Sequence, residues 1–509
     1  MPLKEPSGGS LPNKPASPDR IRLVKATLVV LLLCICVISR TSPSYFDLSL
    51  WHSGSDPASY SHLASHCSDI PPISQSEYYD RQIKLAKKLH ALNASAYIAE
   101  PGANSQFYGN FSKADWNLSE RPLLLIISPI ISQSKSGSDS ASTEIRPQVT
   151  ILTPKFEATR ARMLPVPSAG GAVRYMEWAE EANPYAAALS AIAQSFLPGN
   201  TLSTIPSASA VTIFVDNSIR TFIVDGLLDQ GLESYSRQVS SSARNSTTLM
   251  ANVDNNEIRK VNVVSAPLEI TQMRERKSKA ELQILKCVNE ATLLAIREIH
   301  QKLYPGIQES QARSMMATAL GAAELKAGGC LTLFGENAAL PHGSGTNRRL
   351  SKSDFALFDC TASLHGYYSD VTRTVALSSQ GLSNEQVRIW NLVHAGQRAA
   401  LAAARNGTRT RNVDEVVRAL FKGSGIGYEQ YFTHRLGHGI GLEVHETPYL
   451  RGGSDDIIRP GHTFSDEPGI YIEGKVGVRL EDCFYINEDG VGVLLTDGVG
   501  GLSNAPWLP

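Results

Sequence analysis

Short apolar runs and helical stretches alternate along the first half of the chain. Runs such as "SAYIAE", "LLLIISPI", "VTILTP" and "VTIFVD" have the length and β-branched content of strands, and "PYAAALSAIAQSF" has helical spacing. This alternation predicts an α/β unit over residues 77–265.

The pattern changes near residue 266. There "SAPLEITQMRERKSKAELQILKCVNEATLLAIREIHQKL" keeps apolar residues at helical spacing, and "ESQARSMMATALGAAELKA" follows as a second helix. The rest of the chain consists mostly of short β segments. We therefore expect a second domain over residues 266–509, with two helices preceding a largely antiparallel sheet.

The N-terminus has a different organisation. A basic tail, residues 1–25, precedes an uncharged apolar run from Ala26 to Ser39, and a Ser-, His- and Pro-rich segment, residues 40–76, has the composition of a stalk. No small-residue cleavage site follows the run. The pattern favours an uncleaved membrane anchor, with the rest of the chain lumenal or extracellular, over the cleaved signal of a secreted protein. Sequons at Asn93, Asn110 and Asn117 are compatible with glycosylation.

Composition excludes some functions and leaves others open. Hydrophobic residues make up 42% of the chain, and Lys+Arg 48 balance Asp+Glu 49. There is no net charge that would attract nucleic acid. Five cysteines outside the apolar run are scattered without a CxxC pair, so neither a disulfide framework nor a zinc ribbon is indicated, and Cys360 and Cys483 are expected to be packed thiols.

The candidate chemistry begins in "DCTASLHGYYSD", residues 359–370. Strand-like segments flank a turn-like "SLHG", which places Asp359 and Asp370 on the two arms of a hairpin, with Arg373 close behind. Unpaired buried carboxylates are costly, so two of them require a compensating positive charge.

Histidines cluster in "THRLGHGIGLEVHE". Alternating glycines favour a strand over a helix and allow another backbone to approach closely. In a strand His434 and His438 share one face, whereas His445 has the opposite parity and needs a bulge or turn to join them.

Two more carboxylates interrupt apolar strand-like runs. Glu467 precedes Pro468 in "FSDEPGIYI", and Glu481 follows Arg479 by two residues in "GVRLEDCFYI". Together with the hairpin aspartates they carry a charge of −4, which two divalent cations would neutralise. Oxygen-rich ligation with a single nitrogen suits Mn²⁺, Co²⁺ or Zn²⁺, and two such ions can activate a water molecule.

These motifs resemble the signature of the pita-bread metallopeptidases, which include methionine aminopeptidase, Xaa-Pro aminopeptidase and prolidase. The resemblance implies a C-terminal pita-bread domain with a curved antiparallel sheet and flanking helices, preceded by a smaller α/β creatinase-type domain. "RERKSKAEL" and the α/β segment resemble the creatinase-type part, which methionine aminopeptidases lack. The resemblance is therefore strongest to the proline-directed members.

The resemblance also implies roles for individual residues. Two divalent metals, Mn²⁺ above all, would be held by Asp359, Asp370, His438, Glu467 and Glu481. Glu467 would also move the catalytic proton, and His445 would donate a hydrogen bond to the developing oxyanion. His342 and His434 would border the substrate, and Arg479 would support the last glutamate. The implied substrates are short peptides with proline at the second position, and a homodimer is possible.

Some features depart from the family pattern or leave alternatives open. Thr361 stands where the family usually has glycine, and neither Arg451 nor Arg459 matches the arginine with which prolidases read the substrate carboxylate. Dipeptidase and aminopeptidase therefore both stay open. A non-catalytic binding module on the same fold and a creatinase-like, metal-free amidinohydrolase are the other candidate functions.

Overall fold

The computed structural model describes residues 57–134, 142–195, 211–231 and 261–509. The basic tail and the expected anchor at residues 26–39 lie outside these ranges. All the elements described belong to one unit, Ser55–Pro509. The boundary predicted between residues 265 and 266 stays a prediction.

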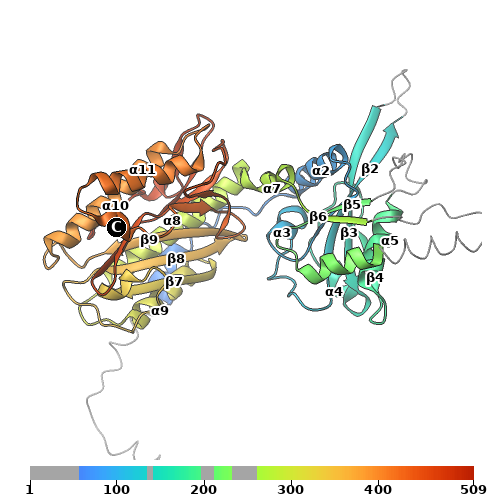
Figure 1. Cartoon of the computed structure of the whole chain (residues 1–509). Coiled ribbons are helices and arrows are strands. Elements are labelled where there is room, and N and C mark those ends of the chain that lie inside the picture. Colours follow the sequence, from blue (N-terminus) through green and yellow to red (C-terminus); the bar gives the residue numbers. More distant parts are fainter. Residues whose placement is uncertain (1–56, 135–141, 196–210, 232–260) are drawn as a thin grey trace, which may run out of the picture. The chain divides into compact units, whose positions relative to one another are not determined.

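The first region is built on a six-stranded mixed sheet with the strand order β4-β3-β2-β1-β5-β6 (Figure 1). Its elements, after η2 (Pro57–Leu63), are α2 (Gln75–Ala91), β1 (Ala96–Ala99), α3 (Ala103–Gly109), β2 (Leu124–Ser134), β3 (Ser142–Pro154), η3 (Lys155–Glu157), α4 (Ala158–Arg162), β4 (Arg174–Trp178), α5 (Pro184–Gln194), β5 (Val211–Val215) and β6 (Val261–Ser265).

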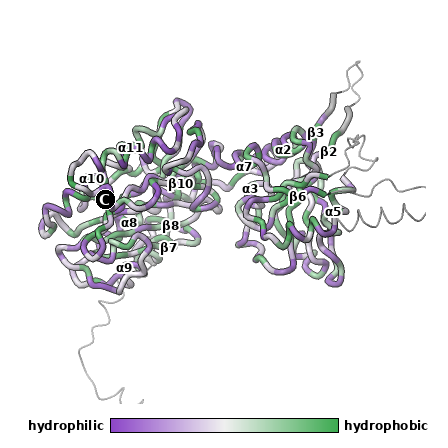
Figure 2. The backbone as a smooth tube through the Cα atoms, viewed as in Figure 1, coloured by the Kyte–Doolittle hydropathy of each residue, from purple (hydrophilic) through white to green (hydrophobic). Residues whose placement is uncertain are grey.

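Both faces of this sheet are buried. Ile98 of β1 packs in a cluster with Leu189 of α5, whereas its neighbour Tyr97 packs in a different cluster with Leu85 of α2. Because successive strand residues point to opposite faces, a strand covered on both sides is apolar throughout. Figure 2 shows such hydrophobic stretches along the strands.

The second region carries the helices and short strands expected after residue 266. Its elements are α7 (Leu268–Glu275), α8 (Lys279–Gln301), α9 (Glu309–Ala322), β7 (Lys326–Phe334), η4 (Gly335–Ala339), β8 (Ala356–Leu364), β9 (Tyr367–Val375), α10 (Asn384–Ala403), α11 (Thr410–Gly423), η5 (Tyr428–Tyr431), β10 (Gly437–Gly439), β11 (Glu446–Leu450), β12 (Thr463–Asp466), β13 (Gly469–Ile472), β14 (Val476–Arg479), β15 (Asp482–Ile486), β16 (Gly492–Leu494) and η6 (Asp497–Val499).

These strands form three antiparallel sheets. The orders are β7-β8-β9, β11-β10-β12-β15-β16 and β13-β14. A bridge between Thr372 of β9 and Glu481 links the first sheet to the chain just before β15. The α/β class and the antiparallel sheets with helices are as the sequence predicted.

The expected single long helix is divided in two. α7 ends at Glu275 and α8 starts at Lys279, where Ser278 and Glu281 cap the new helix reciprocally. Such a capping box satisfies two backbone N–H groups at the start of a helix. The apolar spacing continued through this break, and the capping signal at Ser278 marks it.

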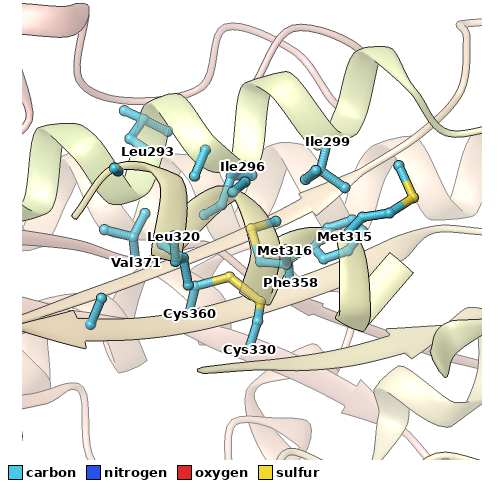
Figure 3. Close-up of a cluster of buried hydrophobic side chains, with 14 of the residues drawn as sticks. Leu293, Ile296, Ile299, Met315, Met316, Leu320, Cys330, Phe358, Cys360 and Val371 are labelled. Carbon is cyan, nitrogen blue, oxygen red and sulfur yellow. A yellow bond between two sulfur atoms is a disulfide. The ribbon is translucent and has the colours of Figure 1, made fainter. Parts of the chain in front are cut away.

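A core cluster lies between α8, α9 and the three-stranded sheet (Figure 3). Ile296 of α8 and Met316 of α9 meet Phe358 of β8 there. Within the same cluster Cys330 and Cys360 form a disulfide between β7 and β8, so the expectation that Cys360 is a packed thiol is wrong. Cys483 is a buried free thiol, as expected.

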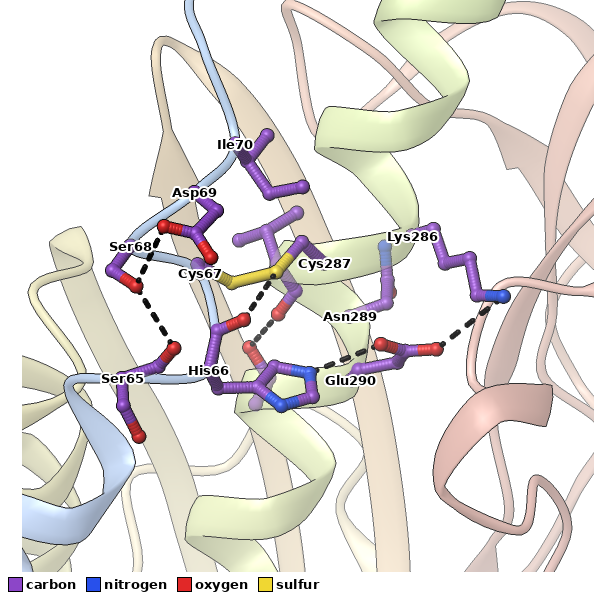
Figure 4. Close-up of a disulfide and its surroundings, with 12 residues drawn as sticks. Ser65, His66, Cys67, Ser68, Asp69, Ile70, Lys286, Cys287, Asn289 and Glu290 are labelled. Carbon is purple, nitrogen blue, oxygen red and sulfur yellow. Dashed lines mark hydrogen bonds and ion pairs between the residues drawn. A yellow bond between two sulfur atoms is a disulfide. The ribbon is translucent and has the colours of Figure 1, made fainter.

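A second disulfide joins Cys67 to Cys287 of α8 (Figure 4). Beside it His66 Nε2 lies 3.0 Å from a carboxylate oxygen of Glu290. Tyr60 is fully buried in the cluster that contains α8 and α9. Residues 57–70, part of the segment expected to be a stalk, are therefore packed against the second region. The scattered cysteine spacing gave no sign of either bridge, because disulfide partners meet only in the fold.

The membrane prediction requires correction. In the described ranges no helix is long and apolar enough to cross a bilayer. The expected anchor itself, residues 26–39, is outside those ranges, and its 14 residues are fewer than the ~20 that a spanning helix requires. The prediction of a single-pass membrane protein with a lumenal or extracellular catalytic domain is wrong.

Candidate metal centre and active site

The hairpin β8–β9 places its two aspartates on one face. Its turn contains His365 and Gly366, both with positive φ, as the "SLHG" sequence predicted. Asp359 lies opposite Thr372, and Asp370 lies opposite Thr361. The aspartates are therefore diagonal neighbours across the two strands, and their side chains point the same way.

The glycines around His438 allow two backbones to approach closely. A Cβ at Gly437 would lie 2.0 Å from Ser465 O, and one at Gly439 would lie 2.6 Å from Glu446 O. The pairing of β10 with β11 shifts register between His438 and Gly439. This irregularity brings His445 to His438, with ring centroids 4.3 Å apart, as the parity argument required.

His438 has its tautomer fixed by the backbone. Its Nδ1 lies 3.0 Å from Gly439 O, so Nδ1 carries the hydrogen and Nε2 has a free lone pair. That Nε2 lies 3.3 Å from Glu467 Oε1 and 3.6 Å from Asp370 Oδ2. The imidazole therefore directs an acceptor nitrogen at carboxylates, an arrangement that a shared cation explains.

The five expected ligands converge on one place. Ligand atoms lie within 4.8 Å of one another in three overlapping groups. The groups are Asp370 with His438 and His445, His438 with Glu467 and Glu481, and Asp359 with Asp370 and Glu481. Shared members make these groups one cluster, and His445 belongs to it as well.

The carboxylates of the cluster are buried and, when charged, repel one another. Burial, and then repulsion from Glu481, Asp359 and Glu467, raise the pKa of Asp370 well above its usual value. Burial, and then Glu467 and Asp359, do the same for the pKa of Glu481. Burial lowers the pKa of His438 to about 3. Neutral imidazole and crowded carboxylates are the groups that a cation would stabilise.

The donor set fits divalent cations. Glu481 is 2% exposed, and while its Oε2 accepts a 2.6 Å hydrogen bond from Thr372 Oγ1, its buried Oε1 has no hydrogen-bond partner among the described atoms. Such an orphaned oxygen is expected of a metal ligand. Four carboxylates with imidazole nitrogen match Mn²⁺, Co²⁺ or Zn²⁺.

A hydrogen-bond chain supports one side of the cluster. Arg479 donates to Asp359 Oδ2 at 2.6 Å and to the Tyr471 hydroxyl oxygen at 3.0 Å. His434 Nδ1 donates to Arg435 O at 2.7 Å, so its Nε2 accepts from the Tyr471 hydroxyl at 2.9 Å. Burial lowers the pKa of His434 to about 4, which keeps this acceptor neutral.

His342 lies at the edge of the same site. It is exposed, and its charge adds to the effects of burial and other charges in lowering the pKa values of His434 and His445. The nine residues singled out from the sequence thus lie in or beside one cluster.

The sequence reading missed some supporting residues. Asn289 Oδ1 accepts from the backbone N of Asp370 at 3.3 Å, and Thr372 binds Glu481. The Tyr471 hydroxyl links Arg479 to His434. A signal existed for Asn289, because it interrupts the apolar residues Leu285, Val288 and Ile296 at helical spacing along α8.

Comparison with known proteins finds a peptidase family profile and peptidase relatives that match this chain. Residues 283–488 match the sequence profile of metallopeptidase family M24. An uncharacterised peptidase of Schizosaccharomyces pombe is 31% identical over 430 residues, which are 84% of this chain and 82% of that protein. An Xaa-Pro dipeptidase of Lactobacillus delbrueckii subsp. lactis is 36% identical over 227 residues, 43% of this chain and 60% of that enzyme.

The fold has solved counterparts. The crystal structure of a dipeptidase from Pyrococcus horikoshii OT3 superposes with a TM-score of 0.61 at 24% sequence identity. The superposition covers 82% of this chain and 97% of that one. At this identity the likeness establishes the fold.

Proposed function

Since this chain belongs to metallopeptidase family M24, we propose that it is a dinuclear metal-dependent exopeptidase that hydrolyses the bond between an N-terminal residue and proline. The observation that carries the proposal is the convergence of four carboxylates and His438 around a buried, unpartnered oxygen of Glu481. Bound cations would neutralise the negative charge of this cluster.

Asp359, Asp370, His438, Glu467 and Glu481 would hold two divalent ions, Mn²⁺ first and Co²⁺ or Zn²⁺ otherwise. When bound, such ions polarise a carbonyl and lower the pKa of water. The four carboxylates would compensate the charge of the ions, and Arg479 would fix the orientation of Asp359.

The remaining steps belong to side chains. Glu467 stands between His438 and His434, with its Oε2 4.0 Å from His434 Nδ1. We assign to it the transfer of a proton from the attacking water to the leaving proline nitrogen. His445 would donate a hydrogen bond to the oxygen of the attacked carbonyl. His342 and His434 would border the bound peptide.

Proline specificity has a physical reason and support from the relatives. The nitrogen of an Xaa-Pro bond carries no N–H, so a peptidase that binds this hydrogen gains nothing from it. Curated relatives from Lactobacillus and Pyrococcus are named Xaa-Pro dipeptidases. We propose that the chain divides into an α/β domain at 77–265 and a catalytic domain at 266–509.

The proposal is tested on purified protein by metal analysis together with turnover of Xaa-Pro and Xaa-Pro-Yaa peptides. Two equivalents of metal and release of the N-terminal residue are expected. Bound metal without turnover of any peptide would favour a binding module on the same fold. Turnover of a small amidine by metal-free protein would favour the creatinase-like alternative.

A further inference from the structure

Glu309 is a fully buried carboxylate at the start of α9. A helix N-terminus favours an anion, but a buried charge is costly unless hydrogen bonds compensate for it. Among the described residues Glu309 belongs to none of the ligand groups that form the candidate metal centre. Its burial therefore has to be explained by the hydrogen bonds that it accepts.

Four hydrogen bonds join the Glu309 side chain to both ends of one loop, residues 335–348. At the first end, Oε1 accepts from the backbone N of Phe334 and from Asn337 Nδ2, both at 2.8 Å. At the second end, Oε2 accepts from the backbone N atoms of Thr346 and Arg348, both at 3.1 Å. Each carboxylate oxygen thus holds one end of the loop, and both ends are fixed to α9.

The loop closes tightly around this carboxylate. Gly345 has a positive φ of 74°, and a Cβ there would lie 2.6 Å from Glu309 Oε2. Glycine permits both the backbone conformation and the close approach. Asn337 Nδ2 also donates to Thr346 Oγ1 at 3.0 Å, so the two ends contact each other as well. The conformation of the loop thus depends on the carboxylate that it encloses.

The middle of the loop borders the metal centre. His342 lies at the edge of the site, where its charge contributes to the lowered pKa values of two active-site histidines. The backbone O of its neighbour Pro341 accepts from Arg479 Nη1 at 3.4 Å. In η4, Ala338 O lies where a Cβ at Gly477 of β14 would come within 1.7 Å. The loop therefore packs directly against the strand that ends in Arg479.

We propose that Glu309 is a positioning residue of the active site, which holds loop 335–348 in the conformation that presents His342 to the substrate. This role rests on the proposed function, in which His342 borders the bound peptide. Glu309 acts on the reaction only through the loop. A displacement of about 1 Å in a substrate-positioning group can cost on the order of 10²-fold in rate, so the loss of this support should be measurable.

The first test is a double-mutant cycle in which Glu309→Gln and His342→Ala are made singly and together. Glutamine keeps the shape of the side chain but turns an amide group towards N–H donors. Alone, Glu309→Gln should lower kcat/KM for the better substrate of Ala-Pro and Ala-Pro-Ala by about 10–100-fold, with two metals still bound. In the His342→Ala background the same change should cost no more than about twofold, because both residues act through one group.

Limited trypsin digestion tests the loop without requiring activity. Arg349 directly follows the loop, is exposed, and forms a β-bridge with Gln308. Proteolysis of a folded protein requires local opening of the cleaved segment. Glu309→Gln should therefore be cut first after Arg348 or Arg349, at sites where the wild type resists. An unchanged digestion pattern would mean that Glu309 does not hold the loop.

Glu290→Gln is the matched control. Glu290 is a buried carboxylate of α8 that forms ion pairs with His66 and Lys286, which lie outside the loop. The change should alter neither kcat/KM nor the digestion pattern.

Asn337→Ala repeats the cycle with a smaller change, since it removes one of the four donors and leaves the carboxylate in place. It should lower kcat/KM by about 3–10-fold, and only where His342 is present. Equal losses in both backgrounds, or no loss in either, would overturn the role of Glu309 while the proposed function stood. A wild-type protein that hydrolysed neither peptide would refute the proposed function, and the positioning role with it.

Discussion

Glu481 and Asp482 are adjacent buried carboxylates with opposite surroundings. Asp482 is fully buried and accepts hydrogen bonds from Arg373 at 2.9 Å, Gln397 at 3.0 Å and Thr496 at 2.6 Å. Glu481 has one oxygen bound to Thr372 and the other bound to nothing that the structure describes. Two consecutive residues thus carry one charge that neighbouring side chains neutralise and one that they do not.

The contrast shows how a site can be told from a structural ion pair. Burial alone does not mark a ligand, since Asp482 is as buried as Glu481. Lack of a partner alone does not mark one either. Asp466 lies opposite Asp482 in the β12–β15 pairing, and both its oxygens are buried without a described partner, yet it belongs to none of the ligand groups. Convergence of several unsatisfied groups is the distinguishing feature.

The largest effect is expected from removing a carboxylate of the cluster. Asp370→Asn should abolish turnover and lower the metal content below two equivalents, because Asp370 belongs to two of the three ligand groups. Metal analysis and kcat on the same preparation measure this. Asp466→Asn, a matched change at a buried carboxylate outside the groups, should leave the metal content unchanged. Two metals and normal turnover in Asp370→Asn would refute the ligand assignment.

Arg373→Met removes the cation that pairs with Asp482 and so tests the structural role of that carboxylate. This change leaves Asp482 buried without its cation, and breaking such a pair typically costs about 3–5 kcal/mol of unfolding free energy. Urea denaturation measures the loss. The folded fraction should still bind two metals, since Arg373 contacts Glu481 only through its backbone oxygen, at 2.8 Å. Loss of metal with unchanged stability would reverse the roles assigned to the two carboxylates.

An intermediate effect is expected at His445, which lies in the cluster but is exposed. His445→Ala should lower kcat by about 10²–10³-fold, the range found when one oxyanion donor is removed. Metal content should stay at two equivalents, because the five expected ligands remain. If one metal were lost instead, His445 would be a ligand, as its grouping with Asp370 and His438 allows.

The sequence predicted the site better than its surroundings. Asp359, Asp370, Glu467 and Glu481 were recognisable because a carboxylate in an apolar run is unusual, and local patterns record that. The Cys67–Cys287 disulfide and the Arg373–Asp482 pair join residues more than a hundred positions apart. The Cys330–Cys360 disulfide depends on the pairing of β7 with β8, and the role of Tyr471 depends on a single hydroxyl direction. No local pattern specifies those. The division between α7 and α8 was visible in principle, in the Ser278–Glu281 capping box.

The smallest effect concerns His462, a buried group that the fold keeps neutral. Burial, and then the charges of Lys277, Arg276 and Arg459, lower its pKa to about 3, and its Nδ1 has no described hydrogen-bond partner. A group whose pKa is depressed in the folded state stabilises the fold above its ordinary pKa of 6.5, and this contribution is lost as the pH falls from there towards 3.

His462→Gln should therefore flatten the acid side of the stability profile. Relative to wild type, the variant should gain up to about 1.4 kcal/mol of unfolding free energy for each pH unit below about 6. Urea denaturation between pH 7.5 and 5 measures the difference, with exposed His90→Gln as the matched control. Parallel profiles for wild type and His462→Gln would mean that His462 takes up its proton in the folded protein. His462 would then behave as an ordinary solvated histidine, unlike the paired Asp482 and the unpaired Glu481.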